Sequence, residues 1–182
     1  MRCSRSWVAA ALVVMSSCGR SVMDQTASTP AAPNDRAAVL ATVALARVAH
    51  DNSFGGEDVF TEVAIVERLG RGSDDGMVAI DAASPAWTPD ERVAVEQALA
   101  PRSVTWVASL EAVIGPGPSM TSPERLIAVV TISSPEIDGD NATVTSMLWC
   151  GGTCGAGSTH TLSRDPQGKW TITGTTGGAF IS

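Results

Sequence analysis

The chain has 182 residues, a formal net charge of −7, no tyrosine and 3 phenylalanines. This length suits a single domain, and the acidic charge repels phosphate backbones, which excludes nucleic acid as an expected partner. The scarcity of Tyr and Phe also removes the aromatic platforms on which single-stranded nucleic acids stack.

Residues 1–17 are expected to be an export signal. Arg2 and Arg5 precede an apolar run from Trp7 to Met15, and positive charge ahead of a short apolar run is typical of signal peptides. The run is far shorter than the ~20 residues that a membrane-spanning helix needs. We therefore expect this segment to be removed rather than to act as an anchor.

Cys18 is the expected lipidation site. The order Met15-Ser16-Ser17-Cys18 resembles a bacterial lipobox, with Met15 and Ser17 where Leu and Gly or Ala are usual. The resemblance implies two lipid chains at Cys18, which together give stable attachment to the bilayer. Gly19 follows instead of Asp, which favours the outer membrane if the cell is Gram-negative. The alternative is an ordinary secretory signal cut nearby.

Without residues 1–17, the chain of 182 residues and net charge −7 becomes 165 residues with net charge −9, because two arginines are lost. Residues 18–34 are small, polar and punctuated by proline, a composition that buries too little apolar surface to fold. They are expected to form a flexible tether. Residues 35–182 are then expected to form one domain.

The domain is expected to start with a helix that Asn34 caps and that ends near Ala49. Its apolar face repeats at helical spacing and contains Val39, Leu40, Val43 and Ala46. Two strand-like runs, Glu62–Leu69 and Met77–Asp81, follow on either side of Asp74-Asp75-Gly76. This turn chemistry predicts a hairpin between them.

A second helix has clear end signals. Thr88 is a good cap, Pro89 suits the first helical position, and Glu91 completes a capping box. Pro101 ends the run after Ala100. We therefore predict a helix between Thr88 and Ala100.

The carboxyl half is expected to be mostly strands. From Ser103 the apolar period changes to two, and Leu126–Ile132 is apolar enough for a central strand covered on both faces. Three further strands are predicted at meander spacing, namely Ala142–Trp149, Ser158–Arg164 and Lys169–Thr175. The pattern predicts an α+β fold in which two helices pack on a curved, mostly antiparallel sheet of five or more strands. A cone-like sheet that encloses a pocket is one member of this class.

Cys150 and Cys154 lie four positions apart among glycines, between two predicted strands. Glycine can adopt positive φ, so the segment can fold back and close a small disulfide, and export favours oxidation. A structural disulfide is the favoured interpretation. Redox exchange is the alternative, although the spacing is not that of the Cys-x-x-Cys motif.

Ser158 and His160 are the candidate polar site, because residues two apart on a strand share a face. A catalytic triad with Asp138 lacks the Gly-x-Ser-x-Gly elbow, and a zinc site that adds His160 and Asp138 or Asp140 to the two cysteines competes with their oxidation. We therefore expect no catalytic residue, no metal and no cofactor. Trp149 and Trp170 are expected to be core aromatics near the disulfide.

The run Cys150-Gly151-x-x-Cys154-Gly155-x-Gly157 is followed by Gly168-Lys169-Trp170 and by a terminal Ile181-Ser182. With these motifs, the last forty or so residues resemble a family of uncharacterised secreted bacterial proteins. The resemblance implies a sheet edge that carries a disulfide, and no assigned reaction.

The sequence favours an envelope lipoprotein whose tethered domain binds an envelope protein or a small molecule without catalysis. A small-ligand or enzymatic pocket in a curved sheet is the first alternative. A periplasmic thiol redox protein that uses Cys150 and Cys154 is the second.

Overall fold

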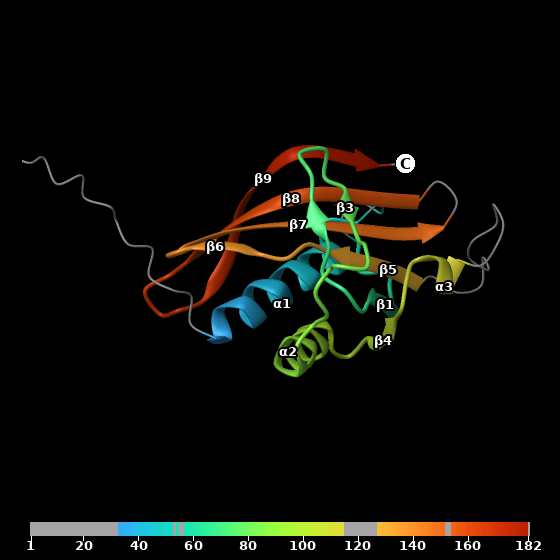
Figure 1. Cartoon of the computed structure of the whole chain (residues 1–182), viewed down its shortest axis with the longest axis horizontal. Coiled ribbons are helices and arrows are strands. Elements are labelled where there is room, and N and C mark those ends of the chain that lie inside the picture. Colours follow the sequence, from blue (N-terminus) through green and yellow to red (C-terminus); the bar gives the residue numbers. More distant parts are fainter. Residues whose placement is uncertain (1–32, 53, 55–56, 115–126, 152–153, 182) are drawn as a thin grey trace, which may run out of the picture.

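The computed structural model describes residues 33–52, 54, 57–114, 127–151 and 154–181 (Figure 1). The expected signal peptide, the lipidation site Cys18 and the tether up to residue 32 lie outside these ranges. Within them, no helix combines the length and the apolar character needed to cross a membrane.

Three helices and nine strands form the described part of the fold, which confirms the α+β class. The helices are α1 (Pro33–Ala49), α2 (Pro89–Leu99) and the short α3 (Glu111–Ile114). The large sheet contains β1 (Glu62–Val66), β4 (Ser103–Val107), β5 (Ile127–Ile132), β6 (Glu136–Asp138), β7 (Asn141–Gly151), β8 (Cys154–Arg164) and β9 (Trp170–Ile181). The remaining two strands, β2 (Arg71–Gly72) and β3 (Val78–Ala79), pair only with each other.

The large sheet is mixed and open, with the order β4-β1-β5-β7-β8-β9 and β6 paired to β7. Strand β1 lies parallel to both β4 and β5, and the pairings from β5 onward are antiparallel. The sheet is therefore mostly antiparallel, as expected. The prediction of a central strand at Leu126–Ile132 is also confirmed, because β5 lies between β1 and β7, and Ala128, Val129 and Val130 are buried.

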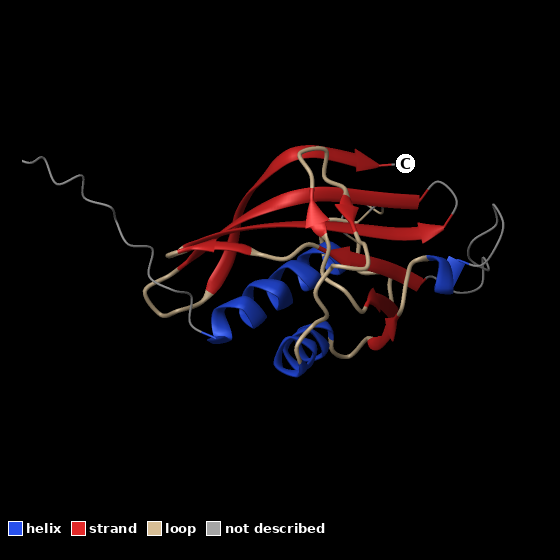
Figure 2. Cartoon of the chain, viewed as in Figure 1, coloured by secondary structure: helices blue, strands red, loops and turns tan. Residues whose placement is uncertain are grey.

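Helices α1 and α2 lie on the same side of the sheet, so we call that side the helix face and the opposite side the outer face (Figure 2). Side chains alternate between the two faces along each strand. On β7 the residues that point to the helix face include Val144, Ser146 and Leu148, and their neighbours Thr145 and Met147 point to the outer face. The alternation separates a helix-covered core from a second surface.

The predicted hairpin forms, but one of its two strands is not the strand that the sequence predicts. The turn at Asp74-Asp75-Gly76 does join two antiparallel strands, but these are β2 and β3, not β1 and β3. The physical reason is that β1 already has neighbours on both edges, so its backbone groups are used. Beyond β1 the Gly70 N–H donates to the Ile132 carbonyl at 2.9 Å, and the chain turns onto the outer face.

The β2–β3 hairpin crosses the outer face over β7 (Figure 1). Gly72 sits so close to the sheet that a Cβ atom there would lie 2.2 Å from Thr145 Oγ1. On the other strand of the hairpin, the Val78 N–H points at Met147 Sδ at 3.4 Å. The hairpin therefore rests directly on the middle of β7.

The helix ends match the predicted signals at α2 and differ at α1. Thr88 and Glu91 form the capping box, with the Thr88 N–H donating to Glu91 Oε2 at 2.7 Å and the Glu91 N–H donating to Thr88 Oγ1 at 3.3 Å. Arg36 Nε also donates to Glu91 Oε1 at 2.6 Å, which ties α1 to α2. Helix α1 begins at Pro33, so Asn34 lies inside the helix and is not its cap. Proline suits the first helical turn because its missing N–H would have no partner there.

Strands β7 and β8 are longer than predicted and continue to the disulfide. The expectation that Trp170 lies near the disulfide is wrong, because Trp170 pairs with Arg164 at the far end of β8, about 30 Å from Cys154 at ~3.3 Å per residue. There the Trp170 Nε1–H donates to Asp35 Oδ1 at 3.2 Å, and Arg164 Nη1 donates to Asp35 Oδ2 at 2.8 Å. These contacts hold the start of α1 on the sheet.

Candidate functional site

A buried polar cluster joins α1 to β7 and β8 on the helix face. Arg47 is 2% exposed, yet its guanidinium reaches two strands. Its Nε–H donates to Ser146 Oγ at 2.9 Å, and its Nη2 donates to Ser158 Oγ and lies 3.1 Å from His160 Nε2. Its Nη1 donates to the Asp51 carbonyl just beyond the end of the helix. One arginine thereby satisfies polar groups from three elements.

The partners of His160 determine which of its ring nitrogens carries hydrogen. A guanidinium can only donate, so His160 Nε2 must present a lone pair to Arg47. Ser146 Oγ lies 3.0 Å from the same Nε2. The proton of the neutral ring is therefore on Nδ1, which is buried, has no hydrogen-bond partner among the described residues and lies 3.6 Å from Asp51 Oδ2.

Burial shifts the protonation of both groups. Burial and the neighbouring Arg47 charge lower the pKa of His160 from 6.5 to about 4, against the opposing influence of Asp51. Burial also lowers the pKa of Arg47 from 12.5 to about 10, so it stays charged at neutral pH. At pH 7 the cluster therefore holds one cationic guanidinium and one neutral imidazole.

The cluster contains the groups of a proton relay, but a substrate could not reach its hydroxyl groups. Asp51, His160 and Ser146 stand in the order of an acid, a base and a hydroxyl. The hydroxyl end is sealed, since Ser146 is 0% and Ser158 4% exposed, and only the Asp51 side chain, at 44%, reaches solvent. A nucleophile must reach its substrate, so this geometry favours a role in holding α1 on the sheet.

The structure brings the two sequence candidates together and adds three residues that were not predicted from the sequence, namely Arg47, Ser146 and Asp51. Ser158 and His160 do share the helix face of β8 and contact the same guanidinium. Arg47 follows Val39 and Val43 at intervals of four on the apolar stripe of α1, and Ser146 interrupts the apolar alternation of β7. A charged or polar residue at a core position was the available signal for both. Asp51, not Asp138, is the carboxylate beside His160.

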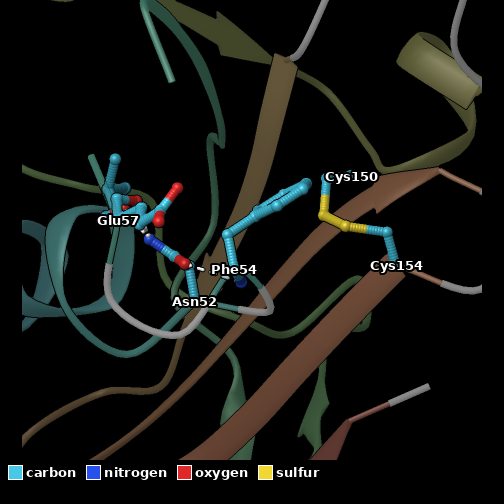
Figure 3. The surroundings of a disulfide bond; sticks show 6 residues. Asn52, Phe54, Glu57, Cys150 and Cys154 are labelled. Atoms are coloured by element: carbon cyan, nitrogen blue, oxygen red, sulfur yellow. Dashed lines mark hydrogen bonds between the residues drawn. A yellow bond between two sulfur atoms is a disulfide. The ribbon is translucent and has the colours of Figure 1, made fainter. Parts of the chain in front are cut away.

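Cys150 and Cys154 form a disulfide with their Cα atoms 5.1 Å apart. It closes the β7–β8 hairpin, and the Phe54 side chain extends toward it (Figure 3). Asn52 Oδ1 accepts the Phe54 N–H at 2.9 Å, and the Phe54 ring meets Phe60 edge to face at 5.7 Å between centroids. Cys150 is 3% exposed and Cys154 is partly exposed, so an attacking thiolate has restricted access to the Cys150 sulfur.

The disulfide also argues against a zinc site that uses Cys150 and Cys154. Cysteines bind zinc as thiolates, and both of these are oxidised to the bridge. Among the residues the structure describes, no group of three or more His, Cys, Asp or Glu side chains is placed to hold a metal ion.

The β2–β3 hairpin divides the outer face into two clefts. We call the first the polar cleft; it has a volume of about 420 Å³ and lies between β2 and the outer faces of β7 and β8. Its floor includes Ser133, Thr143, Thr145 and Thr159, and its rim includes the charged Arg71, Asp74, Asp81 and Glu136. Hydroxyl groups and carboxylates therefore supply most of the polar side chains of this cleft.

The second cleft, which we call the apolar cleft, lies on the β3 side of the hairpin and has a volume of about 300 Å³. Its walls are mainly apolar and include Met77, Ile80, Leu110, Met147 and Trp149. Thr131 also lines it, and the Thr131 Oγ1 atom is buried with no hydrogen-bond partner among the described residues. Trp149 thus faces this cleft instead of the disulfide.

Compared with protein-family models, with curated proteins and with solved structures, the chain matches none of them.

Proposed function

We propose that this chain is an exported, lipid-anchored envelope protein whose domain binds a small molecule on the outer face of its sheet, without catalysis. The anchoring part rests on the signal-like residues 1–17 and on Cys18 in a lipobox-like context. The binding part rests on the structure of residues 33–181.

The contrast between the two faces of the sheet is the observation that supports binding without chemistry. The imidazole and hydroxyl groups that could form a relay are sealed on the helix face, where only the Asp51 side chain reaches solvent. The outer face has two adjoining clefts of about 420 and 300 Å³, one richer in polar groups and one apolar. A third, mainly apolar cleft of about 510 Å³ lies between α1 and β9. Clefts of this size with a few fixed polar groups are the usual sites of small ligands.

The sheet is open, and the space between it and the helices is filled by a packed apolar core that includes Leu40, Val43, Val130 and Leu148. A ligand pocket inside a cone-like sheet is therefore not what the geometry favours. The hairpin provides the enclosure from outside, because its two strands wall the two clefts.

Two measurements test the proposal. Intact mass spectrometry of the protein extracted from membranes should give a chain that starts at an acylated Cys18, and a full-length unacylated chain would contradict anchoring. In backbone amide NMR, at least one probe from a panel of spermidine, sorbitol, citrate and indole should shift residues of the hairpin and of β7. Shifts confined to the helix face, or no shifts with any probe, would contradict binding at the outer face.

A separate experiment tests the proposal that the function involves no catalysis. Ser158→Ala removes a hydroxyl from the buried cluster, and Thr143→Lys places a charged side chain in the polar cleft. If binding in the polar cleft is the function, Thr143→Lys should abolish the cellular function of the protein, and Ser158→Ala should preserve it as long as the domain folds. A folded Ser158→Ala protein without function would contradict the proposal.

A further inference from the structure

The polar cleft has a floor of hydroxyl groups held rigidly by strand backbone. Ser133 and Thr145 are each 4% exposed. The Thr145 N–H donates to Ser133 Oγ at 2.9 Å, and Thr145 Oγ1 lies 2.8 Å from Thr159 Oγ1. Two hydroxyls that bond to each other use only one of their two hydrogens, so this pair keeps a donor and several lone pairs. The floor can therefore still accept and donate hydrogen bonds.

The rim of the cleft carries more negative than positive charge. Arg71 Nη2 contacts Asp81 Oδ2 at 3.3 Å, and Asp81 Oδ1 accepts the Ala83 N–H at 2.8 Å, so this acid is already paired. Asp74 and Glu136 also line the cleft. Within the described ranges neither of these two carboxylates has a hydrogen bond or an ion pair. Two acids, one from the hairpin turn and one from β6, are thus available to a ligand.

From these features we infer that the polar cleft binds an organic cation with primary ammonium groups, of the polyamine class. This inference rests on the proposed function, because it names the ligand of one of the two clefts. An ammonium is a compact charge with three donors, which suits lone pairs on the floor and unpaired carboxylates on the rim. Because both carboxylates line the same cleft, a ligand with more than one ammonium can contact both.

Other ligand classes fit the cleft less well. Anions meet three carboxylates against one guanidinium in the lining, on a chain of net charge −7. Sugar rings and nucleobases commonly stack on aromatic side chains, and none of the described residues that line this cleft is aromatic. A flexible organic cation needs neither a positively charged lining nor an aromatic side chain on which to stack.

The test is a titration with spermidine, followed by calorimetry and by amide NMR of the folded domain. Spermidine should shift amides around Thr143, Thr145 and Glu136, while sorbitol and citrate should not. The double variant Asp74→Asn/Glu136→Gln should weaken spermidine binding about five-fold, as expected for two exposed charge pairs. The matched control Asp90→Asn/Glu57→Gln removes the same charge at exposed positions that do not line the cleft, and its affinity should stay within about two-fold.

Salt gives a second measurement that needs no variant. At about 1 M NaCl the Debye length falls to about 3 Å, so binding to exposed carboxylates should weaken strongly. Binding of spermidine that is insensitive to salt, or equal losses in the two double variants, would overturn the ammonium assignment. Binding of sorbitol or indole without spermidine would overturn it as well, yet would leave the proposed ligand-binding role standing. If no probe shifts the outer face, both proposals fail.

Discussion

The buried histidine makes a quantitative prediction about acid stability. His160 is 0% exposed and contacts the charged Arg47, so a second positive charge in the cluster is unfavourable. Its pKa falls from 6.5 to about 4 in the folded chain. Between these values the unfolded chain binds more protons than the folded one. The contribution of His160 to stability is therefore complete above pH 6.5 and is lost as the pH falls to about 4.

The size of the effect follows from the two pKa values. With 6.5 for the unfolded chain and about 4 for the folded one, the free energy of unfolding should fall by about 2 kcal/mol between pH 7 and pH 5. By pH 4 the loss should reach about 3 kcal/mol. Losses of this size are a large share of the stability of a small domain.

Urea unfolding at several pH values, followed by circular dichroism, measures this slope. The variant His160→Gln keeps an acceptor for Arg47 and does not titrate, so its stability should change much less between pH 7 and pH 5. The chain has only 2 histidines, and the other one, His50, is exposed at the end of α1. His50→Gln is therefore the matched control and should retain the wild-type slope.

Carboxylates also protonate as the pH falls, and this changes the free energy of unfolding. The wild type and both variants contain the same carboxylates, so the difference between their slopes reports the histidine alone. The reasoning would be refuted if His160→Gln and the wild type lost stability in parallel between pH 7 and pH 5. It would also be refuted if His50→Gln, rather than His160→Gln, flattened the slope.

Four further substitutions test other parts of the structure. Arg47→Ala leaves buried hydroxyls without their donor and should cost about 3 kcal/mol or more in urea unfolding, and a cost below about 1 kcal/mol would contradict the central role of Arg47. Cys150→Ser opens a short loop and should cost about 2 kcal/mol, which reduction of the wild type should reproduce. Thr88→Ala removes the cap of α2 and should lower stability by about 1 kcal/mol, and an unchanged unfolding midpoint would count against the capping box. Gly72→Val places a side chain against Thr145 and should cost about 1–3 kcal/mol, with NMR shifts concentrated in the hairpin.

Local features of the fold were predictable where the signal lies within a few residues. The capping box at Thr88, the turn at Asp74-Asp75-Gly76 and the short disulfide all depend on neighbours in sequence. The pairing of β1 was not predictable in this way, because its partners Ser103–Val107 and Ile127–Val130 lie far along the chain. A turn sequence indicates that a hairpin forms, and it does not say which strands are still free to pair.

The candidate sites also contain some features that the local sequence predicts and others that it does not. The alternation of β8 was enough to place Ser158 and His160 on one face, since a strand repeats every two residues. Arg47, Ser146 and Asp51 joined them only when α1 packed on the sheet, because contacts between residues about a hundred positions apart leave no local pattern. The two clefts are likewise absent from any single segment. They exist because Gly72 lets the hairpin approach Thr145 on a face that the helices leave uncovered.

The amino-acid sequence alone therefore determined the class of the fold, the ends of α2, the turn at Asp74-Asp75-Gly76 and the disulfide, all of which arise from short-range backbone and side-chain preferences. The order of the strands, the buried arginine cluster and the clefts were decided by tertiary structure. They depend on which distant backbone edges and side chains compete for the same partners, and that competition is resolved only when the whole core packs.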